Sequence, residues 1–164
     1  MHRRTFIGAL AGGVAGLTGC RSLARSHRTP PSSGYRRRVG LATWVDINDK
    51  AGEVMMRHQY VPRRVEQPPA IYIESEWRQR EPFDDERAHG AEQARSRLVL
   101  TGRVSPTKVS ALGEVYELEL LIENQARRLD GDWGDGGMTP QFLEYANRIA
   151  DDLESSLRST VRRF

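Results

Sequence analysis

Asp130, Asp132 and Asp135 lie in a glycine-rich segment whose alternating carboxylates resemble part of a calcium-binding loop. An EF-hand loop takes oxygen ligands at positions 1, 3 and 5, glycine at position 6 and glutamate at position 12. Counted from Asp130, the last three of these positions hold Gly134, Asp135 and Gln141. The segment therefore predicts an acidic turn ahead of a helix, and we expect no metal site there.

His58 and His89 are the other candidates for metal binding, and neither has a second His or Cys at ligand spacing. A zinc site needs three or four such ligands. Glu74 and Glu76 would share the outer face of one strand, but the sequence supplies neither a pocket nor the charge asymmetry that acid-base catalysis requires. We interpret both as solvated. No nucleophile elbow, phosphate loop or dinucleotide fingerprint occurs, so we expect a non-catalytic protein without a cofactor.

The remaining reactive group is Cys20, the only thiol of the chain. Leu17, Thr18 and Gly19 precede it, and this quartet resembles the lipobox of lipoprotein precursors. The resemblance implies cleavage before Cys20 and acylation of its thiol, for example with palmitate, which would tie the chain to membrane lipid. The alternative is that Cys20 is a small buried residue of an N-terminal helix.

Arg3 and Arg4 precede Phe6 and an apolar run at residues 7–17, which is the order of a charged n-region and an h-region. The run is shorter than the roughly 20 residues of a spanning helix. The arginine pair resembles the twin-arginine export signal, and the modest hydrophobicity of the run agrees with it. We expect residues 1–19 to be a signal peptide. The mature protein would be extracytoplasmic, at a bacterial inner or outer membrane or an archaeal cell membrane.

Composition restricts the function classes. Residues 1–19 hold two of the 25 Lys and Arg residues and none of the 22 Asp and Glu residues, so the mature chain is close to neutral. A nucleic-acid-binding domain would need a continuous basic face, and we therefore expect no nucleic-acid partner. With Cys20 acylated no disulfide is available, so the domain must be stabilised by its core.

A proline- and serine-rich basic segment follows the cysteine. Residues 20–38 contain few apolar side chains, and we interpret them as the lipidated cysteine and a flexible linker. Residues 39–164 then form one folded domain, whose length is sufficient for a core.

Alternation of apolar and polar residues predicts the strands of this domain. We expect five strands, at residues 39–47, 54–60, 71–77, 98–104 and 115–123, the first two joined as a hairpin by a turn at 48–52. The alternative for residues 51–60 is a helix. A short helix is expected near 91–95, a bulge at Gly102 and a loop at 106–113.

A long helix is predicted at the C-terminus. Thr139 supplies an N-cap and Pro140 the first helical position. Apolar residues then recur at spacings of three and four: Phe142, Tyr145, Ile149, Leu153, Leu157, Val161 and Phe164. We expect this stripe to pack on the apolar side of the last strand. The predicted fold class is α+β, an antiparallel sheet of about five strands with one long C-terminal amphipathic helix.

Residues 97–105 (RLVLTGRVS) and 115–124 (VYELELLIEN) resemble the strand pairs of small envelope-assembly lipoproteins, such as penicillin-binding-protein activators and lipopolysaccharide-assembly lipoproteins. The likeness ends at the acidic glycine turn. It implies a membrane-anchored binding or assembly module with an envelope protein as its partner. The alternatives are an immunoglobulin-like sandwich for adhesion and, third, a substrate-binding or enzymatic lipoprotein.

Overall fold

The computed structural model describes residues 34–111, 113–129 and 131–161. The leader residues Arg3, Arg4 and Phe6, and the quartet from Leu17 to Cys20, lie outside this range. The described residues form an α+β fold with one antiparallel sheet of seven strands and three helices. The predicted class is confirmed at that level, and the expected number of about five strands is wrong.

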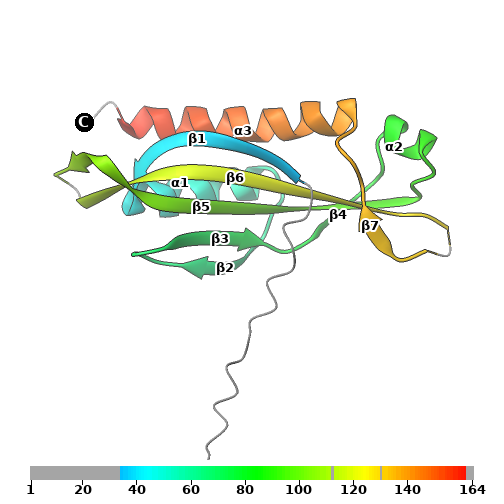
Figure 1. Cartoon of the computed structure of the whole chain (residues 1–164), viewed down its shortest axis with the longest axis horizontal. Coiled ribbons are helices and arrows are strands. Elements are labelled where there is room, and N and C mark those ends of the chain that lie inside the picture. Colours follow the sequence, from blue (N-terminus) through cyan, green and yellow to red (C-terminus); the bar gives the residue numbers. More distant parts are fainter. Residues whose placement is uncertain (1–33, 112, 130, 162–164) are drawn as a thin grey trace, which may run out of the picture.

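The sheet is built around a long β5–β6 hairpin that runs the length of the molecule (Figure 1). The strand order is β2-β3-β5-β6-β1, with β4 added beside β5 and β7 added beside β6. The strands are β1 (Gly34–Thr43), β2 (Pro62–Glu66), β3 (Ile71–Ser75), β4 (Arg78–Arg80), β5 (Gln93–Ser110), β6 (Gly113–Arg127) and β7 (Trp133–Asp135). The helices are α1 (Trp44–Arg57), α2 (Asp84–Ala88) and α3 (Pro140–Val161).

The first predicted hairpin is wrong, because α1 occupies most of it. Thr43 ends β1 and caps the helix, its hydroxyl accepting a hydrogen bond from the Asp46 N–H. Ile47, Ala51 and Val54 are then buried at helical spacing. A helix at residues 51–60 was the weaker alternative for this region. The observed helix begins earlier, at Trp44. Burial of one helical face outweighs the local turn preference of residues 48–52.

The strands also extend beyond their predicted ends. β1 begins at Gly34, so residues 34–38 belong to the sheet and not to the linker. β5 includes residues 93–95, where a short helix was expected, and continues through most of the predicted loop at 106–113. β7 lies within the predicted glycine turn. Each of these segments gains backbone hydrogen bonds from a neighbouring strand, which local sequence patterns do not show.

Gly102 does not mark a bulge. It lies in continuous register opposite Leu118, and the register shift of the hairpin falls between Val104 and Val109. A Cβ atom at Gly102 would lie 3.0 Å from side-chain atoms of both Ile71 and Leu118. The glycine therefore allows close packing of three strands.

The C-terminal helix is confirmed. Pro140 is its first residue, and the Thr139 hydroxyl accepts a hydrogen bond from the Phe142 N–H at 3.4 Å. Five residues of the predicted stripe join the apolar core or pack against it: Phe142, Tyr145, Ile149, Leu153 and Leu157. The side chains of Val161 and Phe164 lie outside the described set.

α1 and α3 contribute to one hydrophobic core with the same side of the sheet. We call this side the covered face. The opposite side, the open face, is not covered by any element of the described residues. It carries mostly charged and polar side chains, together with Val99 and Leu121. Since the described strands form a single sheet, they do not build the two-sheet sandwich of the immunoglobulin-like alternative.

Candidate functional site

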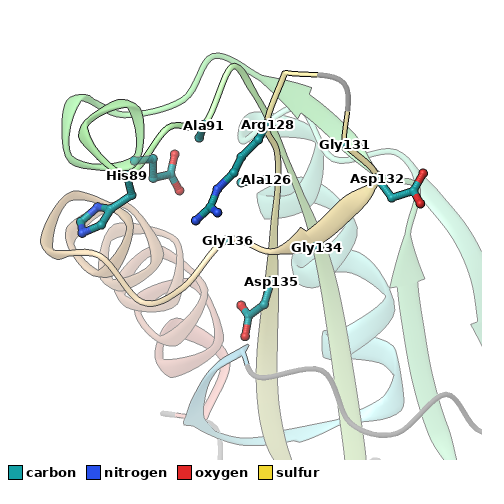
Figure 2. A pocket seen from close by; sticks show the side chains of 10 residues that line it. His89, Ala91, Ala126, Arg128, Gly131, Asp132, Gly134, Asp135 and Gly136 are labelled. Atoms are coloured by element: carbon teal, nitrogen blue, oxygen red, sulfur yellow. The ribbon is translucent and has the colours of Figure 1, made fainter.

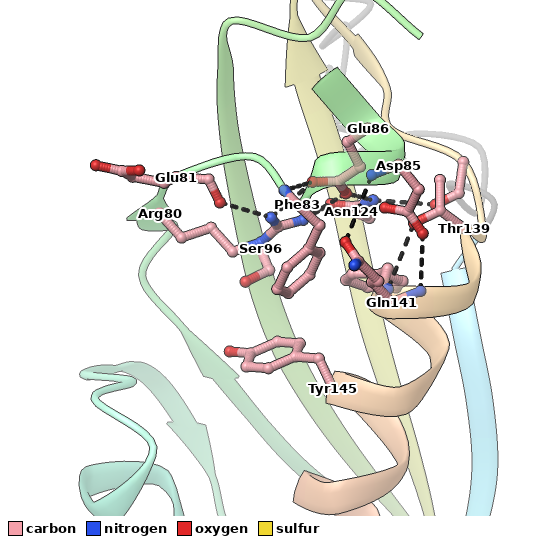
Figure 3. A network of polar contacts seen from close by, with 12 residues as sticks. Arg80, Glu81, Phe83, Asp85, Glu86, Ser96, Asn124, Thr139, Gln141 and Tyr145 are labelled. Carbon is pink, nitrogen blue, oxygen red and sulfur yellow. Dashed lines mark hydrogen bonds and ion pairs between the residues drawn. The ribbon is translucent and has the colours of Figure 1, made fainter. Parts of the chain in front are cut away.

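The covered face ends in a buried polar network next to α2 (Figure 3). The Arg80 guanidinium donates to both carboxylate oxygens of Glu86, at 2.7 and 2.6 Å, and to Asn124 Oδ1 at 2.8 Å. Asn124 Nδ2 donates to Glu86 at 2.8 Å and to the Gly137 carbonyl at 3.0 Å. The Arg80 and Glu86 side chains are only 6% and 1% exposed, so this ion pair is shielded from water.

Aromatic rings and helix ends enclose the network. The Arg80 guanidinium carbon lies 4.2 Å from the Phe83 ring centre and 5.6 Å from that of Phe142. Asp85 Oδ2 accepts from the Gln141 N–H at 2.8 Å, and Gln141 Oε1 accepts from the Asp84 N–H at 2.8 Å. The beginnings of α2 and α3 thus cap each other. These contacts fasten α2 to β6 and to α3.

Glu86 remains ionised in this setting. Burial by itself would raise the pKa of the Glu86 carboxyl, but hydrogen bonds from Arg80, Asn124 and the Phe83 N–H outweigh it and hold that pKa below its usual value. The carboxylate is fully engaged by these donors. It is suited to holding the structure together and not to exchanging protons with a substrate.

A hollow of about 280 Å³ lies between α2 and the segment that leads into β7 (Figure 2). Its lining includes His89, Arg128, Asp132 and Asp135 as well as Glu86. The His89 ring is exposed, and its Nδ1 lies 2.6 Å from the Asp85 carbonyl. The described lining residues include no nucleophile with an adjacent base.

Two glycines of the glycine-rich segment, Gly136 and Gly137, lie beside the hollow in places that other residues would not fit. A Cβ atom at Gly136 would lie 2.6 Å from Asn124 Nδ2. Gly137 has a φ of 72°, in the left-handed region, and its carbonyl accepts from the same amide. Glycine is therefore required where this segment passes over the buried network.

The other candidates from the sequence have structural partners. His58 Nε2 lies 3.0 Å from Asp152 Oδ2 and links α1 to α3. Glu76 is exposed, but Glu74 is buried beside Arg97, so the expectation that both are solvated is wrong for Glu74. No group of three or more metal-ligating side chains comes together within residues 34–161 where the structure is described. The structure thus places His89, Asp132 and Asp135 on the lining of one hollow, and His58, Glu74 and Glu76 away from it.

A cluster of hydroxyl groups lies inside the covered face. The Tyr60 hydroxyl lies 2.7 Å from Ser96 Oγ and 2.8 Å from the Tyr145 hydroxyl, which also accepts from Arg78 at 3.1 Å. Burial raises the pKa of the Tyr60 hydroxyl well above its ordinary value, and the neighbouring Tyr145 adds to this. Tyr60 therefore stays protonated, and the cluster joins the end of α1 to β5 and α3.

Two of the three tryptophans meet a row of arginines on the open face. The Arg95 guanidinium carbon lies 4.6 Å from the Trp77 ring centre and 4.2 Å from that of Trp133. Arg97 lies 4.7 Å from Trp77, and Arg127 lies 5.5 Å from Trp133. We call these five residues the tryptophan-arginine stack. All five are partly exposed.

The charges of the stack are unevenly compensated. Arg97 pairs with Glu74 and with Glu123, each at 2.5 Å. Arg95 instead donates to the neutral Gln125 Oε1, at 2.9 and 2.7 Å. Burial and the charge of Arg97 both lower the pKa of Arg95. Among the described residues no carboxylate forms an ion pair with Arg95, so the stack keeps positive charge that an anion could neutralise.

Strand register creates this arrangement. Arg95 and Arg97 alternate with Ala94, Ser96 and Leu98 along β5, so the arginines point to the open face and the others to the core. The stack was not predicted from the sequence, because residues 91–95 were expected to be helical. The alternation of Arg95 and Arg97 ahead of Leu98 was the available signal.

Comparisons with known proteins leave the family open. No family model matches the sequence, and no curated protein does. A solved structure of the uncharacterized conserved protein YugN from Geobacillus kaustophilus aligns with a TM-score of 0.40 and 12% identity, over 69% of this chain and 85% of that one. None of the described helices is long and apolar enough to cross a membrane.

Proposed function

We propose that this chain is an extracytoplasmic lipoprotein, exported by a twin-arginine signal and anchored through acylated Cys20. Its α+β domain is a non-catalytic binding module for assembly of the cell envelope. The open face of the sheet is its binding surface, and an envelope protein is its partner.

The observation that carries this proposal is the uncovered face. A sheet normally buries both faces or presents one to solvent with alternating polar residues. Here the open face also carries Trp77 and Trp133, whose large rings are enriched at binding surfaces. The same face carries charged groups of both signs, such as the pair of Arg36 on β1 and Glu119 on β6. Such a surface is suited to recognition.

The anchor is tested on Cys20. The wild-type chain should carry acyl chains on Cys20 and partition into the detergent phase, because two or more acyl chains make attachment stable. Cys20→Ser should stay unacylated and uncleaved at this position. An unmodified Cys20 in the wild-type protein would refute the anchor.

The binding surface is tested by photo-crosslinking in intact cells. A photoreactive residue at Thr101, in the middle of the open face, should give a discrete cross-linked protein. The matched control is Ser155, which is exposed on the outer side of α3. Equal patterns at both positions, or a product at Ser155 alone, would exclude the open face as the binding surface.

A further inference from the structure

We infer that the tryptophan-arginine stack docks on the anionic headgroups of the membrane that holds the anchor, and so sets the orientation of the domain. This inference rests on the proposed anchoring at Cys20. It adds a second contact with the same membrane, made by the folded domain and not by the acyl chains.

The composition of the stack matches a membrane interface. Tryptophan is enriched at the headgroup level, where one part of its ring is in an apolar environment and the other in a polar one. Arginine near an anionic leaflet contributes favourably to binding. Trp77 and Trp133 sandwich Arg95, and all three are partly exposed on the open face.

The charge of Arg95 indicates the kind of ligand that would fit the stack. Arg97 already has two carboxylates, whereas the polar partner of Arg95 within the described part of the chain is the amide oxygen of Gln125. No ion pair with a described carboxylate neutralises Arg127 either. A lipid phosphate would supply the oxygens that the planar guanidinium of Arg95 binds in pairs. Asp132 and Asp135 lie near this end and would limit the attraction, so the contact is expected to depend on salt.

The position of the tether places the stack close to the membrane. Gly34, the first described residue, pairs with Glu123 of β6. Glu123 is the residue that pairs with Arg97, and the neighbouring Gln125 pairs with Asp135 of β7. The chain therefore enters the sheet beside the stack. Residues 21–33 reach at most about 45 Å from Cys20 when fully extended.

The geometry also identifies the end of the domain that docks. The stack lies near the α2 end of the elongated sheet, and the turn of the β5–β6 hairpin lies at the opposite end (Figure 1). With the stack on the lipid, the α2 end of the open face lies closest to the membrane. Thr101 lies on the same face, between the stack and the hairpin turn.

Tryptophan quenching tests this contact in the full-length acylated chain. The protein is reconstituted into vesicles of phosphatidylglycerol and phosphatidylcholine that contain acyl-brominated phosphatidylcholine. In a Trp44→Phe variant the emission comes from Trp77 and Trp133, and it should be quenched. In a Trp77→Phe/Trp133→Phe variant the emission comes from Trp44. This residue begins α1, at the opposite end of β1 from Gly34, and its emission should not be quenched.

A charge variant measures the contribution of the stack. In the Trp44→Phe background, Arg95→Gln should lower the docking equilibrium constant about fivefold, the equivalent of one arginine at a charged leaflet. Arg103→Gln is the matched control, since Arg103 is exposed on the same strand and face near the hairpin turn. Thermal unfolding of both variants should match that of the parent, which separates lost docking from lost folding.

Mass spectrometry of the same preparation separates the two proposals. Acylated Cys20 with unquenched Trp77 and Trp133 would overturn the docking inference alone and leave the stack as a protein-binding surface. Equal effects of Arg95→Gln and Arg103→Gln would also overturn it. Unmodified Cys20 would overturn the proposed anchor and, with it, this inference.

Discussion

The two faces of the sheet differ in the types of residue that they carry. On the covered face, Leu98, Leu100, Leu118 and Leu120 meet the apolar sides of α1 and α3, and each is at most 2% exposed. On the open face the same two strands carry charged and polar groups such as Arg97 and Glu119. The period of two along β5 and β6 therefore separates a core from a surface within one hairpin.

This difference shows where stability and function are placed. Burial of apolar area is the main favourable contribution to folding, so substitutions on the covered face are costly. Exposed ion pairs such as that of Arg36 and Glu119 on the open face contribute little, whereas Glu74 and Glu123 of the same face are buried beside Arg97. The two partly exposed tryptophans on that face are the basis of the proposed recognition surface.

The α2 end of the covered face is the exception, because it buries an ion pair. Removing one partner of a buried pair typically costs about 3 to 5 kcal/mol, since the other charge stays buried without compensation. We expect Glu86→Gln to lower the free energy of unfolding by about this amount, measured by urea denaturation. Glu81→Gln is the control, because Glu81 is exposed and pairs only with Arg87 at the surface. Equal effects of the two would show that the network is not what fastens α2.

Neighbouring leucines on β6 compare the two faces directly. Leu120 is completely buried and Leu121 is partly exposed on the open face. Leu120→Ala should cost about 2 to 5 kcal/mol, because it removes buried methyl groups and leaves a cavity. Leu121→Ala should cost less than half as much. Thermal unfolding of both variants measures this, and a reversed order would mean that the open face is covered by something in the native protein.

Acid should weaken the covered face through Glu86. The folded-state pKa of Glu86 lies below the value of 4.5 for an ordinary carboxyl. A group with a lowered pKa stabilises the fold above its unfolded pKa, and this stabilisation is lost as the pH falls through the folded one. The stability difference between wild type and Glu86→Gln should therefore be constant near neutral pH and shrink below about pH 4.5. A difference that stays constant down to pH 3 would contradict the assignment.

The smallest effect is expected for the open face. Arg36 and Glu119 are both nearly half exposed, and their ion pair at 3.2 Å joins β1 to β6. Arg36→Gln should change the free energy of unfolding by no more than about 1 kcal/mol. The measurement is urea denaturation at low and moderate salt. A larger, salt-independent loss would place this pair in a shielded interface and weaken the contrast between the faces.

The sequence by itself determined the features with strong local signals. Thr139 and Pro140 start α3 where they were expected to, and the stripe through Ile149 and Leu153 faces the core. The alternation of Leu118, Leu120 and Ile122 identified β6 and its buried side. Capping and periodicity act within a few residues, so they can be read from the chain before any tertiary contact is known.

Only the tertiary structure decided the rest. Residues 44–57 are helical because Ile47 and Val54 pack into the core with α3 and the sheet. The alternation of apolar and polar residues in this segment would also suit a strand. Glu74 is buried because β5 brings Arg97 to it. The tryptophan-arginine stack combines side chains from the segment between β3 and β4, from β5, from β6 and from β7. Its residues are distant in sequence, and strand register alone brings them onto one face.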